Sequence, residues 1–149
     1  PTDKGQIPTG KVVSVAKTPF DFRKGMRIGE MINAANTDLE IGRGYDHNWV
    51  LSSEADENGL RVAAEVVAAK SGRKMTVLTT EPGVQFYGGN FLNNTQVGKS
   101  GKTYAKRSAL CLETQHFPDS PNHDNFPSTI LRPGETYNHV CIYRFGVVK

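Results

Sequence analysis

A glutamate stands inside an apolar, strand-like segment of the chain, residues 109–119 with the sequence ALCLETQHFPD. In a strand, Leu110 and Leu112 would face one side, and Cys111, Glu113 and Gln115 would face the other. Glutamate is depleted in strands and is rarely buried without a partner. We therefore expect Glu113 to border a polar cleft, where a carboxylate can act as a base.

Two other strand-like segments carry a polar residue in a comparable position. Asp46 opens the segment DHNWV, where it shares one face with Asn48, and Gln85 lies between Val84 and Phe86. Three strands could therefore each offer one polar side chain to a common concave surface. The pattern by itself favours the simpler alternative, in which each residue faces solvent on a half-exposed sheet.

The histidines and cysteines do not suggest a metal site. No two of the four histidines have the short, regular spacing of zinc ligands, and the cysteines are far from them in sequence. His47 alternates onto the face of Trp49, so we expect it to be packed rather than catalytic. Cys111 and Cys141 both lie in apolar segments and are predicted to be buried, inert thiols.

The elements that must position these residues are mostly short strands separated by Gly, Pro and Asn. The segment 61–70 is ambiguous, because its alanines favour a helix and its valines a strand, but the turn at 71–73 favours a hairpin. One short helix is predicted at 28–35. Strands are predicted at 10–15, 47–51, 61–70, 75–79, 84–87, 109–115 and 137–148. This order predicts an all-β fold, an antiparallel β-sandwich, in one domain.

Composition excludes several classes of protein. The chain has 149 residues, with 18 basic and 15 acidic ones, which leaves a net charge of +3. The densest basic run, 99–107, lies in a glycine-containing loop without a nucleic-acid-binding motif, so a solvated surface loop is expected and no nucleic acid partner. No apolar run approaches the roughly 18 residues of a membrane span. Neither a membrane partner nor a signal peptide is expected, which favours a cytoplasmic location, and an extracellular one stays open.

Several separated motifs resemble, in the right order, the galactose mutarotase (aldose 1-epimerase) family. They are GYDHN at 44–48, TTEPGVQFY at 79–87 followed by GNF at 89–91, LETQ at 112–115 followed by PD, FP at 126–127 and LRPGE at 131–135. The resemblance is collinear and runs from the first residues to Phe145. It implies a β-sandwich of the large galactose mutarotase-like (supersandwich) type with an open sugar cleft.

The resemblance also implies an activity, the interconversion of the α and β anomers of aldohexoses such as galactose and glucose. The glutamate of the LETQ motif, here Glu113, is then the general base, which takes the proton from the C1 hydroxyl while a histidine protonates the ring oxygen. Asp46 and Gln85 match family residues that bind the sugar. Neither a metal nor an organic cofactor is implied.

The chain departs from the family pattern in one large respect. The N-terminal Asn-His segment that carries the family's catalytic acid is absent, and none of the four histidines matches it. Residues 1–149 are therefore interpreted as the C-terminal portion of a single mutarotase-like domain. The acid would come from the N-terminal portion of the same protein or from a companion chain, and this chain alone would be an inactive part of an isomerase. A non-catalytic, lectin-like sugar-binding homologue is the alternative, and a fragment that binds no sugar is the third reading.

Overall fold

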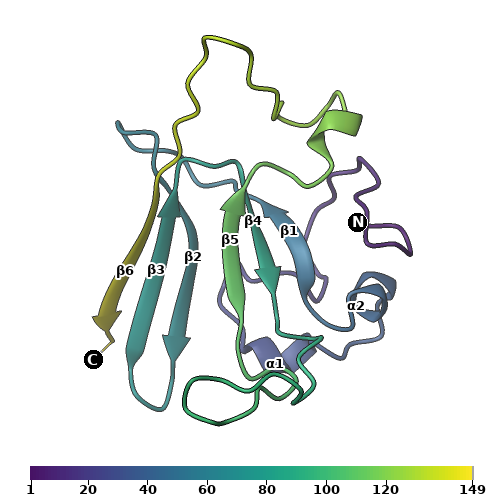
Figure 1. The fold of residues 1–149 in the computed structure, drawn as a ribbon, viewed down its shortest axis with the longest axis vertical. Helices are drawn as coiled ribbons and strands as arrows, with labels where there is room; N and C mark the ends of the chain where they lie inside the picture. The colour runs from purple at the N-terminus through teal and green to yellow at the C-terminus, as the bar shows by residue number, and fades with distance from the viewer. Residues whose placement is uncertain (149) are drawn as a thin grey trace. The chain divides into compact units, whose positions relative to one another are not determined.

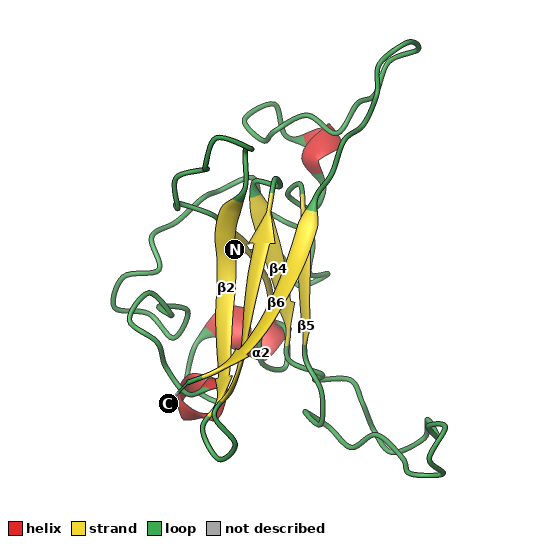
Figure 2. Cartoon of the chain, turned by 90° about the vertical axis from the view of Figure 1, so that its left-hand side faces the viewer, coloured by secondary structure: helices red, strands yellow, loops and turns green. Residues whose placement is uncertain are grey.

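The computed structural model describes residues 1–148, and nearly all of their regular structure is β (Figure 1). Two antiparallel three-stranded sheets have the strand orders β1-β4-β5 and β2-β3-β6. The strands are β1 (Asp46–Val50), β2 (Arg61–Ala68), β3 (Arg73–Thr79), β4 (Gly83–Tyr87), β5 (Cys111–Gln115) and β6 (Cys141–Val147). The helices are α1 (Ile28–Met31), α2 (Thr37–Ile41) and the 3-10 helix η1 (Ser120–Asn122). Long loops make up much of the remaining chain (Figure 2).

The chain divides into two compact units. The first consists of residues 1–47 and 86–111, and the second of residues 48–85 and 112–149. Strands β1, β4 and β5 each begin in one unit and end in the other. Gln85 and Glu113 belong to the second unit, and Asp46 belongs to the first.

The second unit contains the sheet β2-β3-β6. The expected hairpin is confirmed, since β2 pairs antiparallel with β3 from Arg61 opposite Thr79 to Ala68 opposite Arg73. Its tight turn places Gly72 at a φ of +68°, a conformation that glycine adopts without a steric penalty. The valines of β2 therefore outweigh its alanines, because β-branched side chains suit a pleated sheet. Strand β6 pairs along the other edge of β3, whose Val77 is fully buried.

The first unit is organised around an aromatic core. Tyr45 is fully buried, its ring stacks on Phe86 at a centroid distance of 5.4 Å, and Phe22 meets it edge-on at 5.1 Å. The Tyr45 hydroxyl donates a hydrogen bond of 2.8 Å to the carbonyl oxygen of Pro19. His47 packs edge-on against Phe20 at 4.8 Å, so the expectation that it is a packed residue is confirmed.

Two sequence-based expectations in the first unit are wrong. Residues 10–15 form no strand within residues 1–148, and Val12 and Val13 stay exposed. The predicted helix 28–35 is formed only from Ile28 to Met31. A second helix, α2, begins beyond it because the Asn36 side chain accepts hydrogen bonds from the backbone N–H groups of Asp38 and Leu39.

Candidate functional site

Gln85 and Glu113 lie on hydrogen-bonded neighbouring strands, β4 and β5. On β5, Leu112 and Thr114 are half-buried and Glu113 between them is exposed. On β4, Val84 and Phe86 are buried, whereas Gln85 is half-buried. The predicted alternation is therefore confirmed on both strands, and each polar residue projects from the less buried side of its strand.

The same alternation corrects the interpretation of the cysteines. Cys111 is two residues before Glu113 and is exposed, and Cys141 is half-buried, so neither is the buried thiol that was expected. Because side chains two residues apart in a strand share a face, Cys111 lies on the side of Glu113 rather than in the core. Neither cysteine forms a disulfide.

Asp46 is the first residue of β1 and is half-buried in the first unit. The Asn90 amide fixes the backbone just before it, by donating hydrogen bonds to the carbonyl oxygens of Gly42 (3.0 Å) and Tyr45 (2.8 Å). Gly44, with a φ of +132°, has no room for a side chain, because a Cβ would collide with the Asn90 amide oxygen. The backbone that leads into Asp46 is thus held rigidly in place within the first unit.

His47 next to Asp46 is held as a neutral imidazole. Its Nδ1 accepts a hydrogen bond of 3.0 Å from the backbone N–H of Asp46. Burial lowers the pKa of His47, and the nearby carboxylates of Asp38 and Asp46 oppose this effect without cancelling it. The imidazole therefore serves packing near the start of β1.

The structure also contains a polar cluster that sequence reasoning missed, centred on Glu81 in the second unit. The Glu81 carboxylate is only 2% exposed. One of its oxygens, Oε2, is 2.5 Å from Nδ1 of His116. The other, Oε1, accepts from the hydroxyl of Tyr137 (2.8 Å) and is 2.9 Å from Nδ1 of His139. We call these four residues the Glu81 cluster.

The Glu81 cluster keeps its central carboxylate charged. Burial by itself would raise the pKa of Glu81, but the hydrogen bonds from Tyr137, His139 and His116 outweigh burial and leave the pKa below its ordinary value. The same hydrogen bond raises the pKa of Tyr137, which therefore remains a donor. His116, Tyr137 and His139 are 35 to 58 residues away from Glu81 in sequence, and no spacing rule detects partners at such distances. The sole signal in the sequence was a carboxylate two residues before the apolar strand β4.

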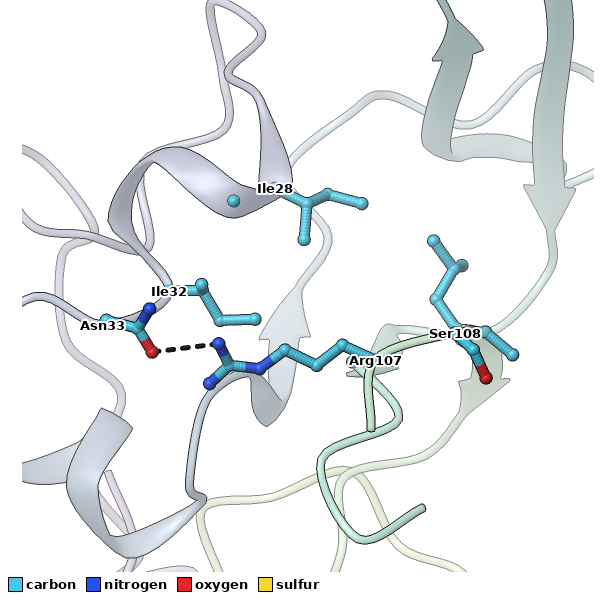
Figure 3. Close-up of a pocket in the computed structure, with 9 residues that line it drawn as sticks. Ile28, Ile32, Asn33, Arg107 and Ser108 are labelled. Atoms are coloured by element: carbon cyan, nitrogen blue, oxygen red, sulfur yellow. Dashed lines mark hydrogen bonds between the residues drawn. The ribbon is translucent and has the colours of Figure 1, made fainter. Parts of the chain in front are cut away.

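The first unit also contains a pocket of about 510 Å³ (Figure 3). Ile28, Ile32 and Leu110 give it an apolar wall, and the Arg107 guanidinium donates a hydrogen bond of 2.9 Å to the side chain of Asn33. None of Asp46, Gln85 and Glu113 lines this pocket. Among residues 1–148, no group of His, Cys, Asp or Glu side chains is arranged to hold a metal ion. No described helix has the length and apolar character needed to cross a membrane.

Known proteins resemble this chain over nearly its whole length. A sequence model of the aldose 1-epimerase family matches residues 1–144. The galactose mutarotase of Mus musculus is 46% identical over 147 residues, which cover 99% of this chain and 41% of that protein. The aldose 1-epimerase of Escherichia coli is 40% identical, over 97% of this chain and 41% of that protein. The chain thus spans about two fifths of the length of these relatives.

Solved structures show the same fold. An aldose epimerase homologue from C. elegans superposes with a TM-score of 0.83 at 31% identity, covering 100% of this chain and 43% of that one. A galactose 1-epimerase from Lactobacillus acidophilus superposes with a TM-score of 0.81 at 24% identity, covering 99% of this chain and 40% of that one. The expected fold class, all-β and galactose mutarotase-like, is therefore confirmed. On the family match over residues 1–144, this chain belongs to the aldose 1-epimerase family.

Proposed function

We propose that the protein containing this chain is an aldose 1-epimerase, which interconverts the α and β anomers of aldohexoses such as galactose and glucose. The observation that carries the proposal is the family match over residues 1–144, together with the exposed Glu113 on a strand next to that of Gln85. The relatives' names, galactose mutarotase and aldose 1-epimerase, support the same substrate class.

Glu113 is the general base in this proposal. Its exposed carboxylate takes the proton of the C1 hydroxyl, a carbonyl forms at C1, and the bond from C1 to the ring oxygen breaks as an acid protonates that oxygen. Rotation about the C1–C2 bond then presents the other face of the aldehyde. Ring closure reverses both proton transfers, so the same two groups exchange roles and no atom is gained or lost.

Gln85 and Asp46 bind sugar hydroxyls in this proposal. A glutamine amide can both donate and accept hydrogen bonds, whereas an aspartate carboxylate only accepts, and a sugar hydroxyl can satisfy either group. Gln85 projects from the less buried side of β4, beside the strand that carries Glu113. Each of these groups would orient the sugar so that its C1 hydroxyl meets the base.

The acid, a histidine, comes from an N-terminal portion that this chain does not contain, either in the same protein or in a companion chain. Two observations support this partner. The chain spans about two fifths of its relatives' length. In addition, the alternate residues Tyr143, Phe145 and Val147 of β6 are large, apolar and exposed, the last two at 76% and 71%. Exposed apolar surface of this kind is typical of a face that another part of a protein covers.

The test uses the full-length protein that contains this chain, with polarimetry of freshly dissolved α-galactose and α-glucose. Wild type should accelerate the approach to anomeric equilibrium, and Glu113→Gln should slow it by about a hundredfold to ten-thousandfold, the usual contribution of a general base. Glu57→Gln is the matched control, because it makes the same change at an exposed turn residue. A Glu113→Gln protein with an undiminished rate would refute the assigned base.

Calorimetry separates catalysis from a lectin-like role. Sugar binding by the full-length wild type without any acceleration of anomer exchange would refute the epimerase and favour the sugar-binding alternative. The isolated chain, in contrast, should be inactive in the same assay, since it carries no matching acid. Activity of the isolated chain would show that the acid is one of its own residues and would overturn the assignment of the acid to the missing portion.

A further inference from the structure

The Glu81 cluster joins the ends of three strands. Glu81 is two residues before β4, His116 directly follows β5, and His139 is two residues before β6. In Figure 1 the start of β4, the end of β5 and the start of β6 all lie at the upper end of the strands. A single buried carboxylate therefore connects three chain segments. It lies beside the hydrogen bond that joins the backbone of Thr80 to that of Val140, where β3 and β6 pair.

The two strands that carry the candidate site residues are both tied to this carboxylate. Gln85 is four residues after Glu81 on the same segment, and Glu113 is three residues before His116. A second contact joins the same two segments, because a Cβ on Gly83 would lie 3.0 Å from the Phe117 ring and 2.8 Å from the Asn48 side chain. The segment after β5 is therefore packed closely against the start of β4.

We propose that Glu81 is a positioning residue, which fixes the relative placement of Gln85 and Glu113 through its bonds to His116, Tyr137 and His139. The effect of Glu81 on the reaction rate rests on the proposed function, whereas its role in placing Gln85 and Glu113 does not. Glu81 itself touches no sugar in this proposal. It acts on the reaction only through the base, because a misplacement of about 1 Å between reacting groups can slow an enzyme by about a hundredfold.

The charge of Glu81 is essential to this role. Its two oxygens only accept hydrogen bonds, and three donors converge on them. In Glu81→Gln, one carboxylate oxygen is replaced by an NH2 group. This group is itself a hydrogen-bond donor, so it cannot accept the hydrogen bonds that the replaced oxygen accepted. Glutamine has almost the same volume as glutamate. The substitution therefore disrupts the hydrogen bonds to position 81 and leaves the packing intact.

The experiment measures kcat and KM for anomer interconversion in the full-length protein. We expect Glu81→Gln to lower kcat by about tenfold to a hundredfold. In a double variant with Glu113→Gln, it should slow the reaction little further, since a residue that acts through the base has no effect once the base is gone. Glu65→Gln is the matched control, because it makes the same change at another hydrogen-bonded carboxylate of the second unit. Glu65 lies on β2, where it accepts a hydrogen bond from Thr76 and forms an ion pair with Lys74. The rate of this control should equal that of wild type.

An unchanged kcat in Glu81→Gln would overturn the proposal, and so would fully additive losses in the double variant. If Glu81→Gln fails to fold, Tyr137→Phe provides the test, because it removes one exposed donor and should lower kcat by a few fold while thermal unfolding stays close to that of wild type. The proposal is also refuted if Glu81→Gln misfolds and Tyr137→Phe keeps the wild-type rate. Glu81 would then be needed for folding only.

Nitrogen NMR of the histidines tests the structural part without any assay. In wild type, Nδ1 of His116 and of His139 should carry the proton, since each faces a carboxylate oxygen that can only accept. Glu81→Gln should shift at least one of them to another tautomer and speed hydrogen exchange at the amides of Gln85 and Glu113. If wild type proves inactive, the proposed function fails, and these signals still decide whether Glu81 positions the two residues. Unchanged tautomers and exchange rates would refute that.

Discussion

The two units of the chain hold their strand ends in opposite ways. In the first unit, the start of β1 is set by aromatic packing around Tyr45, whose ring contacts Phe22 and Phe86. In the second unit, the ends of β4, β5 and β6 converge on the buried charge of Glu81. Each unit contains histidine in this role, but His47 is neutral among rings, whereas His116 and His139 each face a carboxylate oxygen.

The difference shows what each kind of contact can specify. Apolar packing is non-directional and tolerates substitutions that conserve volume, so it stabilises a fold without fixing an angle. Hydrogen bonds to a buried charge are directional and lose their value when one partner changes. A reaction that needs a base placed within a fraction of an ångström is better served by the second arrangement, and that arrangement lies beside Gln85 and Glu113.

The largest expected loss of stability is in the aromatic core of the first unit. Tyr45→Ala should lower the free energy of unfolding by about 3–5 kcal/mol, because it removes a fully buried ring and leaves a cavity. Tyr45→Phe removes only the hydrogen bond to Pro19 and should cost about 1 kcal/mol. Urea unfolding of the full-length protein measures both. Equal losses in the two variants would mean that a polar bond, and not packing, holds this unit together.

A smaller loss is expected where the second unit is tightest. Gly83→Ala should lower the free energy of unfolding by about 1–3 kcal/mol, because its Cβ would come within 3.0 Å of Asn48 and Phe117. Gly146→Ala on β6 is the control, since a Cβ there meets nothing within 4 Å. We expect no loss for Gly146→Ala. Comparable losses at both positions would show that Gly83 is not specially constrained, and would weaken the case for a rigid segment beside Glu81.

The sequence predicted the strands well wherever side-chain alternation and turn residues agreed. The strand β4 with Gln85 and the strand β5 with Glu113 follow from two-residue periodicity, whereas the hairpin of β2 and β3 follows from the valines of β2 and the glycine-containing turn at 71–73. Residues 10–15 show the same apolar pattern without becoming a strand. A strand requires a partner, and periodicity within one segment does not reveal whether a partner exists.

The roles of Glu113 and Gln85 stay predictions, but their exposure on the strands was predictable from the sequence, and the support of the strands was not. A polar residue in an apolar strand is conspicuous, and the family resemblance gave each of the two its expected role. The Glu81 cluster assembles side chains from three distant segments, and only the fold brings them together. It also explains why β6 starts at Cys141 although a strand was predicted from 137: Tyr137 and His139 are bound to Glu81 instead of continuing the strand.

As the pH falls, the two units should lose stability in a definite order. The expected change in the free energy of unfolding is smaller than for the substitutions above. Burial lowers the pKa of His47 in the folded state, so the unfolded chain takes up a proton more readily. Stability from His47 is therefore complete above its unfolded pKa of about 6.5 and is lost as pH falls toward the folded value. The pKa of Glu81 is also lowered in the folded state, but Glu81 is a carboxyl group whose ordinary pKa is 4.5. Its contribution is therefore lost only as pH falls below that value.

Hydrogen exchange followed from pH 7.5 to pH 4 measures this order directly. Amides of β1 and α2 should lose protection first, with a slope of at most about 1.4 kcal/mol per pH unit for one titrating group. Amides near Glu81 should keep their protection until the pH is below about 4.5. His47→Phe should remove the loss near neutral pH, whereas His123→Gln, a matched change in the loop after β5, should leave it in place. Simultaneous loss of protection in both units would contradict the contrast drawn between a buried neutral imidazole and a buried charged carboxylate.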